Sequence, residues 1–297
     1  MWSDWSLFRY LVILHIAKYL PDKLFLRIVF PLQVGYKLNL DNPRSYNEKL
    51  QWLKLFDRKP EYSTMVDKVE AKKYVTNIIG EKYVIPTLAV YNTPEEIDFS
   101  VLPNQFVLKV THDSGGVVIC TNKKELEKEC ALDMLNKSMK VNYYWKNREW
   151  PYKNVKPRII AEKYMCDASG GLTDYKFFCF NGKPEYMFIA TDRFTEGEET
   201  KFDFYDMNFN HLPFINGHPN ATKPIQKPLC FEEMKQIAAQ LSKSIPHVRI
   251  DLYEVNGKVY FGEMTFFHWS GFVPFEPIEW DYIFGEKIKL PKKFQDN

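Results

Sequence analysis

One segment near the C-terminus, residues 248–265, constrains the fold most, because it has the pattern of two strands joined by a turn. Successive side chains on a strand point to opposite faces of the sheet. Arg249 and Asp251 therefore share one face of the first strand, and Glu263 and Thr265 share one face of the second. The chain must build a sheet that holds this hairpin.

The register of the hairpin decides whether its two acids meet. A two-residue turn at Asn256-Gly257 would pair Asp251 with Gly262, whereas a three-residue loop with glycine at positive φ pairs Asp251 with Glu263. We predict the three-residue loop. Facing carboxylates repel unless a cation lies between them, and such oxygen ligands suit Mg2+ that carries phosphates. Taken alone, the segment is explained more simply as a surface hairpin with solvated acids.

The composition narrows the class of protein. With 297 residues, of which 45% are hydrophobic and 26% charged, the chain can bury a large core in one elaborate domain or two closely packed ones. A formal net charge of +2, without a long basic run, argues against nucleic acid as a partner. The 5 cysteines form no CxxC pair, which argues against a zinc site or a disulfide framework and favours a cytoplasmic protein.

The N-terminal region has the pattern of two amphipathic helices. The apolar residues 7–17 are interrupted by Arg9 and His15 and are fewer than the roughly 20 needed to cross a bilayer. A second helical pattern follows Pro21. We expect the pair to pack on its own domain. The second interpretation is peripheral association with the inner face of the membrane through Arg9, Lys18, Lys23 and Arg27.

After residue 40 the pattern alternates between helices and strands. Ser45 and Glu48 have the spacing of a capping box that opens a helix ending at Asp57. The strands come in pairs joined by turn signals, so we predict an α+β or α/β fold with mostly antiparallel hairpins. The other predicted helices are 67–79, 123–139 and 231–244, and the predicted strands are 83–91, 106–110, 158–165, 174–180 and 185–191.

A second motif couples a lysine to a glycine loop. Lys109 lies in the apolar strand 106–110, where a charge is costly unless it is used, and the loop Ser114-Gly115-Gly116 follows. Glycines let backbone N–H groups approach a polyphosphate, so this is a phosphate-binding arrangement, although such a hairpin is more often only a turn. For His112 and Asp113 we favour hydrogen bonds that anchor the loop over metal ligation or a role as an acid/base pair.

A third motif ends the apolar strand that begins at Ile159. Its last residues, Glu162, Lys163, Tyr164 and Met165, would suit an adenine pocket, with backbone groups at the edge of the base and the methionine against its face. Taken alone, this motif is an ordinary strand end.

In this order, the three motifs resemble the ATP-grasp superfamily, and further segments resemble the TupA-like ATP-grasp family over nearly the whole chain. Members of that family are associated with bacterial surface polysaccharide and teichuronopeptide biosynthesis, and some carry a glycosyltransferase label. The resemblance implies an ATP-grasp fold, α+β, that holds a nucleotide between two subdomains. The further segments are 46–52, Asp67-Lys68, 112–115, 148–152, 174–178 and 276–281.

The resemblance also implies a division of the chain into four parts. An N-terminal helical segment (1–44) precedes a substrate-side subdomain (45–104), the ATP-grasp lid subdomain (105–165) and the C-terminal catalytic subdomain (166–297).

ATP and Mg2+ are the implied cofactors. Lys68 and Lys109 would contact the α- and β-phosphates beneath a flexible loop of Ser114, Gly115 and Gly116. The remaining implied nucleotide contacts are Glu162, Lys163, Tyr164 and Met165 for adenine, Asp174 for ribose and Lys176 for the terminal phosphate.

The metal ligands implied by the resemblance are Asp251, Glu263 and Thr265, with Arg249 as the clamp on the transition state and the acyl phosphate. Most ATP-grasp enzymes have asparagine where this chain has Thr265, so a water would lie between its shorter side chain and the metal, or a second metal would bind weakly.

The implied reaction is carboxylate–amine ligation. A carboxylate attacks the γ-phosphate of ATP, and an amine then displaces phosphate from the acyl phosphate. We expect the substrates to be an amino acid and a glycan or precursor that contains hexuronic acid. A glycosyltransferase and a non-catalytic nucleotide-binding protein are the alternatives. Candidates for the acceptor side are Arg148, Arg193, His268, Trp269, Ser270 and Gly271.

Overall fold

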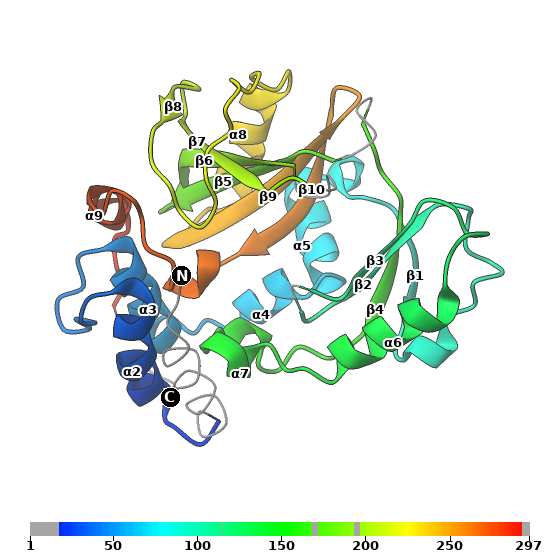
Figure 1. Ribbon diagram of the computed structural model, residues 1–297, viewed down its shortest axis with the longest axis horizontal. Helices are drawn as coiled ribbons and strands as arrows, with labels where there is room; N and C mark the ends of the chain where they lie inside the picture. The colour runs from blue at the N-terminus through cyan, green and yellow to red at the C-terminus, as the bar shows by residue number, and fades with distance from the viewer. Residues whose placement is uncertain (1–17, 114, 168–171, 193–196, 293–297) are drawn as a thin grey trace.

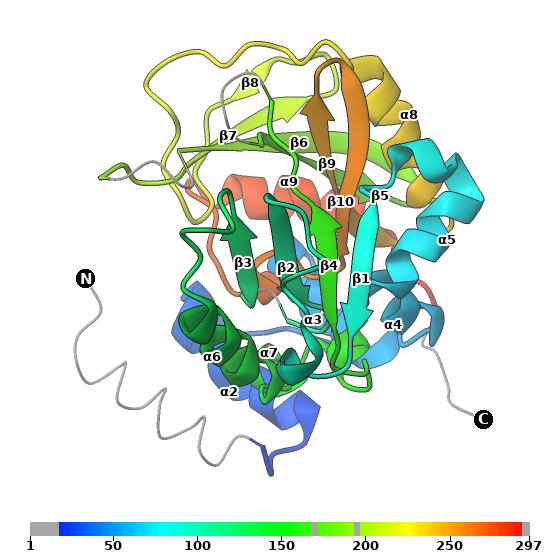
Figure 2. The same ribbon diagram turned by 90° about the vertical axis from the view of Figure 1, so that its right-hand side faces the viewer.

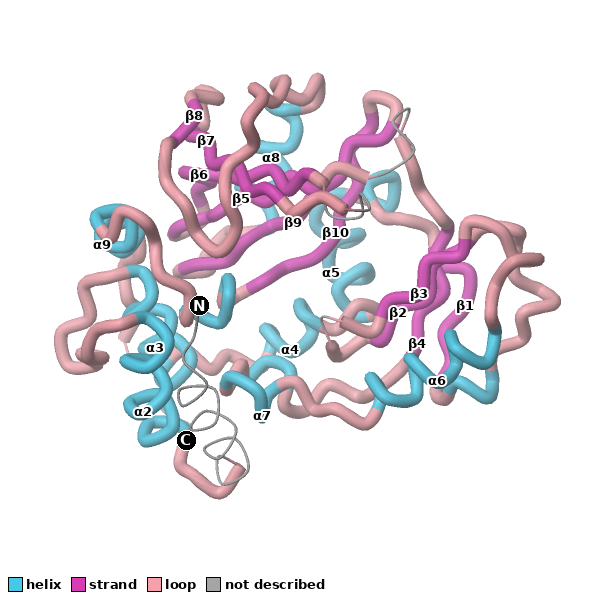
Figure 3. The backbone as a smooth tube through the Cα atoms, in the orientation of Figure 1, coloured by secondary structure: helices cyan, strands magenta, loops and turns pink. Residues whose placement is uncertain are grey.

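A computed structural model describes residues 18–113, 115–167, 172–192 and 197–292. Two sheets form its framework, one with strand order β1-β4-β2-β3 and the other with order β10-β9-β5-β6-β7-β8 (Figures 1 and 3). All pairs of neighbouring strands in both sheets are antiparallel. The predicted α+β class with mostly antiparallel hairpins is therefore confirmed.

The smaller sheet consists of β1 (Thr87–Tyr91), β2 (Phe106–Val110), β3 (Val117–Cys120) and β4 (Ile159–Lys163). One face packs on helix α6 (Lys128–Met139) through a separate apolar cluster. Because side chains alternate, Lys109 points to the opposite face. Strand β1 pairs with β4, so this sheet joins strands on both sides of the predicted boundary at residue 104, which stays a prediction.

The larger sheet consists of β5 (Asp174–Phe180), β6 (Lys183–Thr191), β7 (Lys201–Asp206), β8 (His211–Leu212), β9 (His247–Val255) and β10 (Lys258–Thr265). Helix α8 (Phe231–Leu241) covers its apolar face, as Figures 1 and 2 show. The opposite face carries the charged residues of β5, β9 and β10, because Lys176 pairs with Asp251, which pairs with Glu263.

The β9–β10 hairpin corrects one prediction and confirms another. Its turn has two residues, Asn256 and Gly257, with φ of 52° and 70°, so the predicted three-residue loop is wrong. The predicted pairing of Asp251 with Glu263 is nevertheless confirmed, because the register shifts at Gly262. This β-bulge adds one residue to β10 and returns Glu263 to the face that holds Asp251.

Helix α3 (Tyr46–Phe56) begins with the predicted capping box, since the side chains of Ser45 and Glu48 each accept a backbone N–H of the other residue. Five predicted elements are shorter than expected, namely those at 67–79, 83–91, 123–139, 158–165 and 231–244. The helix predicted from residue 67 is α5 (Glu70–Ile79), because the Asp67 carboxylate instead accepts the N–H groups of residues 69 and 70. The strand predicted from residue 83 begins after Pro86. The remaining helices are α4 (Glu61–Val66), α7 (Tyr144–Asn147) and α9 (Glu279–Lys287), with short 3-10 turns η1 (Glu81–Tyr83), η2 (Pro94–Glu96), η3 (Trp150–Tyr152) and η4 (His268–Gly271).

Helix α2 (Asp22–Val34) packs on the domain through a buried face that includes Phe25, Val29 and Phe30. Leu24 and Leu32 remain on its exposed side. No helix within residues 18–292, leaving aside the undescribed positions, is long and apolar enough to cross a membrane. The first predicted helix, residues 7–17, lies outside the described residues, and peripheral membrane association stays a prediction.

Candidate active site

A cavity of about 390 Å3 lies where the charged face of the larger sheet meets the smaller sheet. This volume is within the ordinary range of small-molecule sites, roughly 300–1,000 Å3. Apolar residues of β2 and β3 line one part, and charged residues of both sheets line the rest. The residues singled out from the sequence that line it are Lys68, Lys109, Glu162, Lys163, Tyr164, Met165, Asp174, Lys176 and Glu263.

Lysines surround a buried carboxylate on the smaller-sheet side. Glu162 pairs with Lys109 at 2.7 Å and also with Lys72. Burial alone would raise the pKa of Glu162, but the charges of Lys109 and Lys72 outweigh it and hold the pKa below its ordinary value. Lys68 lies just before α5 and donates to the backbone oxygen of Asp113. Lys68 and Glu263 line the same cavity. Burial lowers the pKa of Lys68, and the charge of Glu263 offsets part of this effect.

Strand β4 ends at the rim of this cavity. The N–H of Lys163 bonds to the oxygen of Pro86 at 3.0 Å, and Tyr164 and Met165 follow along the lining. Val107 and Ile119 provide an apolar wall beside them. This part of the cavity therefore offers an apolar slot with backbone polar groups at its edge.

The loop between β2 and β3 is closely anchored. His112 Nε2 lies 2.9 Å from the oxygen of Val141, and Asp113 accepts the hydroxyl of Ser138, so both residues make the loop-anchoring contacts expected of them. A Cβ at Gly116 would lie 2.7 Å from Ser138 Cβ, so close packing alone requires a glycine at this position. Gly115 has open space around it by comparison, and Ser114 lies outside the described residues.

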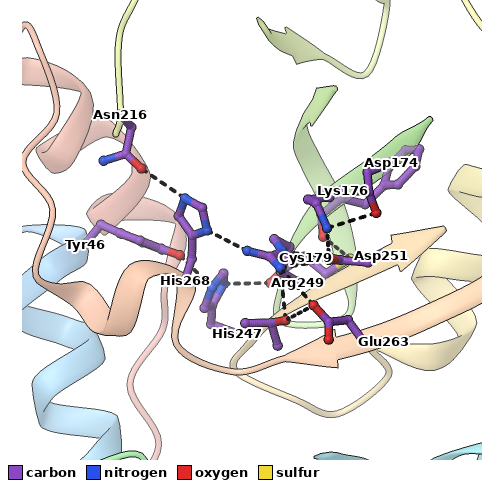
Figure 4. A network of polar contacts seen from close by, with 12 residues as sticks. Tyr46, Asp174, Lys176, Cys179, Asn216, His247, Arg249, Asp251, Glu263 and His268 are labelled. Atoms are coloured by element: carbon purple, nitrogen blue, oxygen red, sulfur yellow. Dashed lines mark hydrogen bonds and ion pairs between the residues drawn. The ribbon is translucent and has the colours of Figure 1, made fainter. Parts of the chain in front are cut away.

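A buried ionic network occupies the charged face of the larger sheet (Figure 4). Asp251, with a side chain 0% exposed, accepts from Arg249 at 2.7 and 2.8 Å and from Lys176. Lys176 also lies 3.2 Å from Asp174. Burial alone would raise the pKa of Asp251, but Arg249 and Lys176 outweigh it, so its pKa is lowered and the carboxylate is ionised.

The same guanidinium reaches the second strand of the hairpin. Arg249 Nη2 lies 3.1 Å from Thr265 Oγ1 and 3.4 Å from Glu263 Oε1, and Nη1 lies 2.7 Å from His268 Nδ1. The site therefore gathers the arginine, both acids and the threonine that the sequence singled out, with the arginine at the centre.

The donor set fits a magnesium ion that arrives with phosphates. Asp251, Glu263 and Thr265 supply only oxygen atoms, from one face of two neighbouring strands. Glu263 has a side chain 43% exposed, whereas that of Asp251 is 0% exposed and both of its oxygens already accept N–H groups. Within the described residues no group of three or more His, Cys, Asp or Glu could form a complete protein cage. Mg2+ commonly binds through one or two carboxylates plus substrate phosphates, which matches this set.

Most residues singled out for the acceptor side are buried rather than open. Arg148 is 0% exposed, pairs with Asp22 at 3.1 Å and lies over the ring of Phe25, so it supports α2 and does not reach the cavity. His268, Ser270 and Gly271 are also buried in η4. Trp269 is 40% exposed, and Arg193 lies outside the described residues.

Sequence reasoning missed a buried cluster beneath η4. Lys54 donates to the oxygen of Ser270 at 2.7 Å and to that of Asn147 at 2.9 Å, and Ser270 Oγ donates to Glu149. It also missed Lys72 in the cavity wall, although its position four residues after Lys68 was a usable signal. The cluster could not be found from spacing, because Lys54 lies on α3, Asn147 on α7 and Ser270 in η4, far apart along the chain.

Comparison with known proteins identifies the family. The D-alanine–D-alanine ligase of Bacillus anthracis in complex with ATP is similar at 16% identity and a TM-score of 0.39, over 68% of this chain and 53% of that one. The D-alanine–D-alanine ligase of Helicobacter pylori is similar at 12% identity and a TM-score of 0.45, over 82% of this chain and 69% of that one. The ATP-grasp ligase PsnB with minimal precursor, Mg and ADP is similar at 11% identity and a TM-score of 0.40, over 74% of this chain and 57% of that one.

This chain thus spans about half the length of the Bacillus anthracis ligase. No curated protein matches it. A family model described as TupA-like ATPgrasp matches residues 48–289, which confirms the resemblance predicted from the motifs and the ATP-grasp fold that it implies. The chain belongs to the TupA-like ATP-grasp family.

Proposed function

We propose that this protein is an ATP-dependent carboxylate–amine ligase that forms an amide through an acyl phosphate. The observation that carries the proposal is the cavity itself, whose lining includes Lys68 and Lys109 from near the smaller sheet and Asp174, Lys176 and Glu263 from the larger one. Arg249 does not line the cavity but contacts Glu263, which does. A triphosphate needs cations along its length, whereas its adenine needs an apolar slot. Both are present on opposite parts of one lining.

The lining supports one orientation of ATP. The base would enter the apolar slot beside Val107, Ile119 and Met165, with its edge against the backbone of residues 163–165. The phosphates would then extend toward Lys68 and Lys109. Asp174 and Lys176 lie on β5 across from them, where a carboxylate can accept a ribose hydroxyl and an ammonium can reach the terminal phosphate.

When bound, Mg2+ would supply charge neutralisation between the phosphate oxygens and the acids. Glu263 and Thr265 would hold it together with Asp251, since all three lie on one face of β9 and β10. Asp251 has a second task in this protein, because it keeps Arg249 and Lys176 in place before any ligand arrives.

The chain's own residues would act mainly by holding anions in line. A substrate carboxylate oxygen attacks the γ-phosphorus while the bond to the β-phosphate oxygen breaks, which gives ADP and an acyl phosphate. An amine then attacks the acyl carbon and inorganic phosphate leaves. Arg249 and Lys176 would neutralise the charge on the transferred group, and the burial of both side chains strengthens that effect.

For the substrates, we carry forward an amino acid and a hexuronic acid-containing glycan or precursor used in bacterial surface polysaccharide biosynthesis. Trp269 supports this choice, because it is 40% exposed beside η4 and stacks on Phe202 with ring centroids 6.0 Å apart. An exposed indole of this kind can pack against the apolar face of a sugar ring.

The experiment is a phosphate-release assay with ATP, Mg2+ and a panel of uronic acids, each paired with amino acids. We expect release that requires both substrates, with an amide product of matching mass. Lys109→Ala should lower the rate at least about 100-fold, since it removes a cation from the phosphate path. Lys73→Ala is the matched control, because that lysine is 70% exposed on α5.

Three results would overturn the proposal. One is ligation that survives Lys109→Ala unchanged. Another is transfer of sugar from a nucleotide sugar without ATP, which would support a glycosyltransferase instead. The third is ATP binding without turnover on any pair of the panel, which would favour a nucleotide-binding protein that lacks catalysis.

A further inference from the structure

The guanidinium of Arg249 is held on two opposite edges. Of its five N–H groups, Nε and one Nη2 donate to Asp251 at 2.7 and 2.8 Å. The second Nη2 hydrogen is directed at Thr265 and Glu263, at 3.1 and 3.4 Å. One Nη1 hydrogen goes to His268 Nδ1 at 2.7 Å. Among the described residues, no acceptor contacts the last Nη1 hydrogen, which is the donor left for an incoming anion.

The contacts of His268 determine where its proton lies. An arginine can only donate, so Nδ1 of His268 must be the bare, accepting nitrogen. Nε2 then carries the proton and donates to Asn216 Oδ1 at 2.9 Å. The amide nitrogen of Asn216 donates to the backbone oxygens of Val273 and Pro274 at 3.2 and 3.0 Å, which orients its oxygen toward the histidine. Figure 4 shows this line of donors running from Arg249 through His268 to Asn216.

Burial makes this arrangement firm. His268 is 2% exposed and Asn216 is 1% exposed, so water cannot easily replace either contact. Burial lowers the pKa of His268 well below its ordinary value, and the charge of Arg249 lowers it further, so the ring is neutral. Its ring also packs edge-on against Phe178 and beside Phe188, with centroids 5.0 and 5.4 Å apart.

A neutral acceptor suits this position. A carboxylate in place of His268 would also accept from Nη1, but it would add a second negative charge beside Asp251 and weaken the attraction of the guanidinium for a phosphate. An imidazole fixes the direction of Nη1 and leaves the positive charge of Arg249 available.

We propose that His268 and Asn216 are positioning residues, which hold the neutral Nε2–H form of His268 against Arg249 and so aim its remaining Nη1 hydrogen at the transferred phosphoryl group. The catalytic part of this inference rests on the proposed function. It replaces the expectation that His268 contacts the substrate itself, since both ring nitrogens are already used.

The first test reads the tautomer directly, in the nucleotide-free protein with 15N-labelled histidine. We expect His268 to carry its proton on Nε2 and to have a bare Nδ1. His247 is an internal comparison with the opposite tautomer. Its Nδ1 donates to the oxygen of Cys179 at 3.0 Å, and its Nε2 accepts from Tyr46 at 2.9 Å. The spectrum of His268→Gln assigns the signal. A proton on Nδ1 of His268 would overturn the inference, whatever the enzyme's substrates are.

The second test separates positioning from packing. His268→Phe keeps a ring against Phe178 but cannot accept from Arg249, so kcat should fall about 100-fold while KM for ATP changes less than about threefold. His268→Gln restores an acceptor oxygen and should recover kcat to within about tenfold of the wild type.

Asn216→Asp tests the same contact without changing His268. The new carboxylate cannot donate to the backbone oxygens of Val273 and Pro274, so its direction toward Nε2 of His268 is no longer fixed, and kcat should fall toward that of His268→Phe. Unchanged kcat in both variants would contradict the inference. If the wild type shows no ATP-dependent ligation on any pair, the proposed function fails, and the tautomer measurement still decides whether His268 holds Arg249 in this way.

Discussion

Replacing each of the two facing carboxylates by its amide tests how they divide their tasks. Asp251 has a side chain 0% exposed and holds two cations, Arg249 and Lys176. Glu263 has a side chain 43% exposed and contacts Arg249 only at 3.4 Å. Asp251→Asn keeps the size of the side chain but leaves both cations without their closest counter-ion, whereas Glu263→Gln removes a charge that water already solvates.

The structure sets the expected magnitudes. Breaking a buried ion pair by removing one partner costs about 3–5 kcal/mol. Removing one partner of an exposed pair costs about 0–1 kcal/mol. At about 2–4 °C per kcal/mol, Asp251→Asn should lower Tm by roughly 6–20 °C and Glu263→Gln by less than about 4 °C. Both variants should lose ligation by about 100-fold or more, because each removes a negative charge that is proposed to bind the metal.

The assays are thermal and urea unfolding without nucleotide, followed by ADP formation in Mg2+ at a temperature where all variants are folded. We expect the two variants to lose similar amounts of ligation activity but different amounts of stability. Equal loss of stability in both, or a loss below about 1 kcal/mol for Asp251→Asn, would refute the claim that Asp251 holds the apo network together.

Three further changes test other parts of the cavity and the sheet. Gly116→Ala places a Cβ 2.7 Å from Ser138 Cβ and should cost about 1–3 kcal/mol in urea unfolding, whereas Gly115→Ala, with its nearest neighbour at 3.8 Å, should not. Lys72→Met should weaken ATP binding about tenfold in a direct titration. Without Lys72, Glu162 would attract Lys109 more strongly and so compete with the phosphates for it. Unchanged affinity would contradict this. Burial lowers the pKa of His247 to about 3, so between about pH 6.5 and 3 the unfolded chain binds a proton that the folded chain does not. The free energy of unfolding therefore falls as the pH drops through this range, by up to about 1.4 kcal/mol per pH unit. His247→Gln should flatten that slope in urea unfolding.

Element positions were predictable where the hydrophobic pattern was strong. The strands predicted at 106–110 and 174–180 have the same bounds in the structure. The helix predicted from residue 123 begins only at Lys128, because Lys123 instead donates to backbone oxygens of Phe99 and Leu102. Local pattern thus located the buried elements, whereas tertiary hydrogen bonds set where one of them starts.

The hairpin register shows what a pattern leaves out. Asn256-Gly257 is a strong two-residue turn signal, and the structure has that turn. Asp251 and Glu263 nevertheless face each other, because Gly262 forms a β-bulge in β10. A glycine inside a strand often marks a bulge, so the signal was in the sequence. To use this signal, one must assume that the two-residue turn and the pairing of Asp251 with Glu263 both occur in the same hairpin.

Residue type alone also failed to separate binding residues from supporting ones. Arg148 and His268 are the kinds of residue that hold substrates, yet one is buried against α2 and the other donates and accepts within the protein. The cavity residues were easier, because Lys109, Glu162 and Lys176 are charges inside apolar strands. Such charges need partners, and here each finds one on the neighbouring strand of its own sheet.

Helix α3 connects the supporting residues to the chemistry. In η4, Trp269 and Ser270 have φ of 49° and 56°, a conformation that L residues rarely adopt without compensation. Gln51 donates to the oxygens of Ser270 and Gly271 at 3.1 and 2.7 Å, and Lys54 donates to Ser270 at 2.7 Å. These bonds hold the turn that begins with His268 beside Arg249. A substitution in α3 should therefore act on the reaction through the direction of one guanidinium, although α3 contributes no residue to the lining of the cavity.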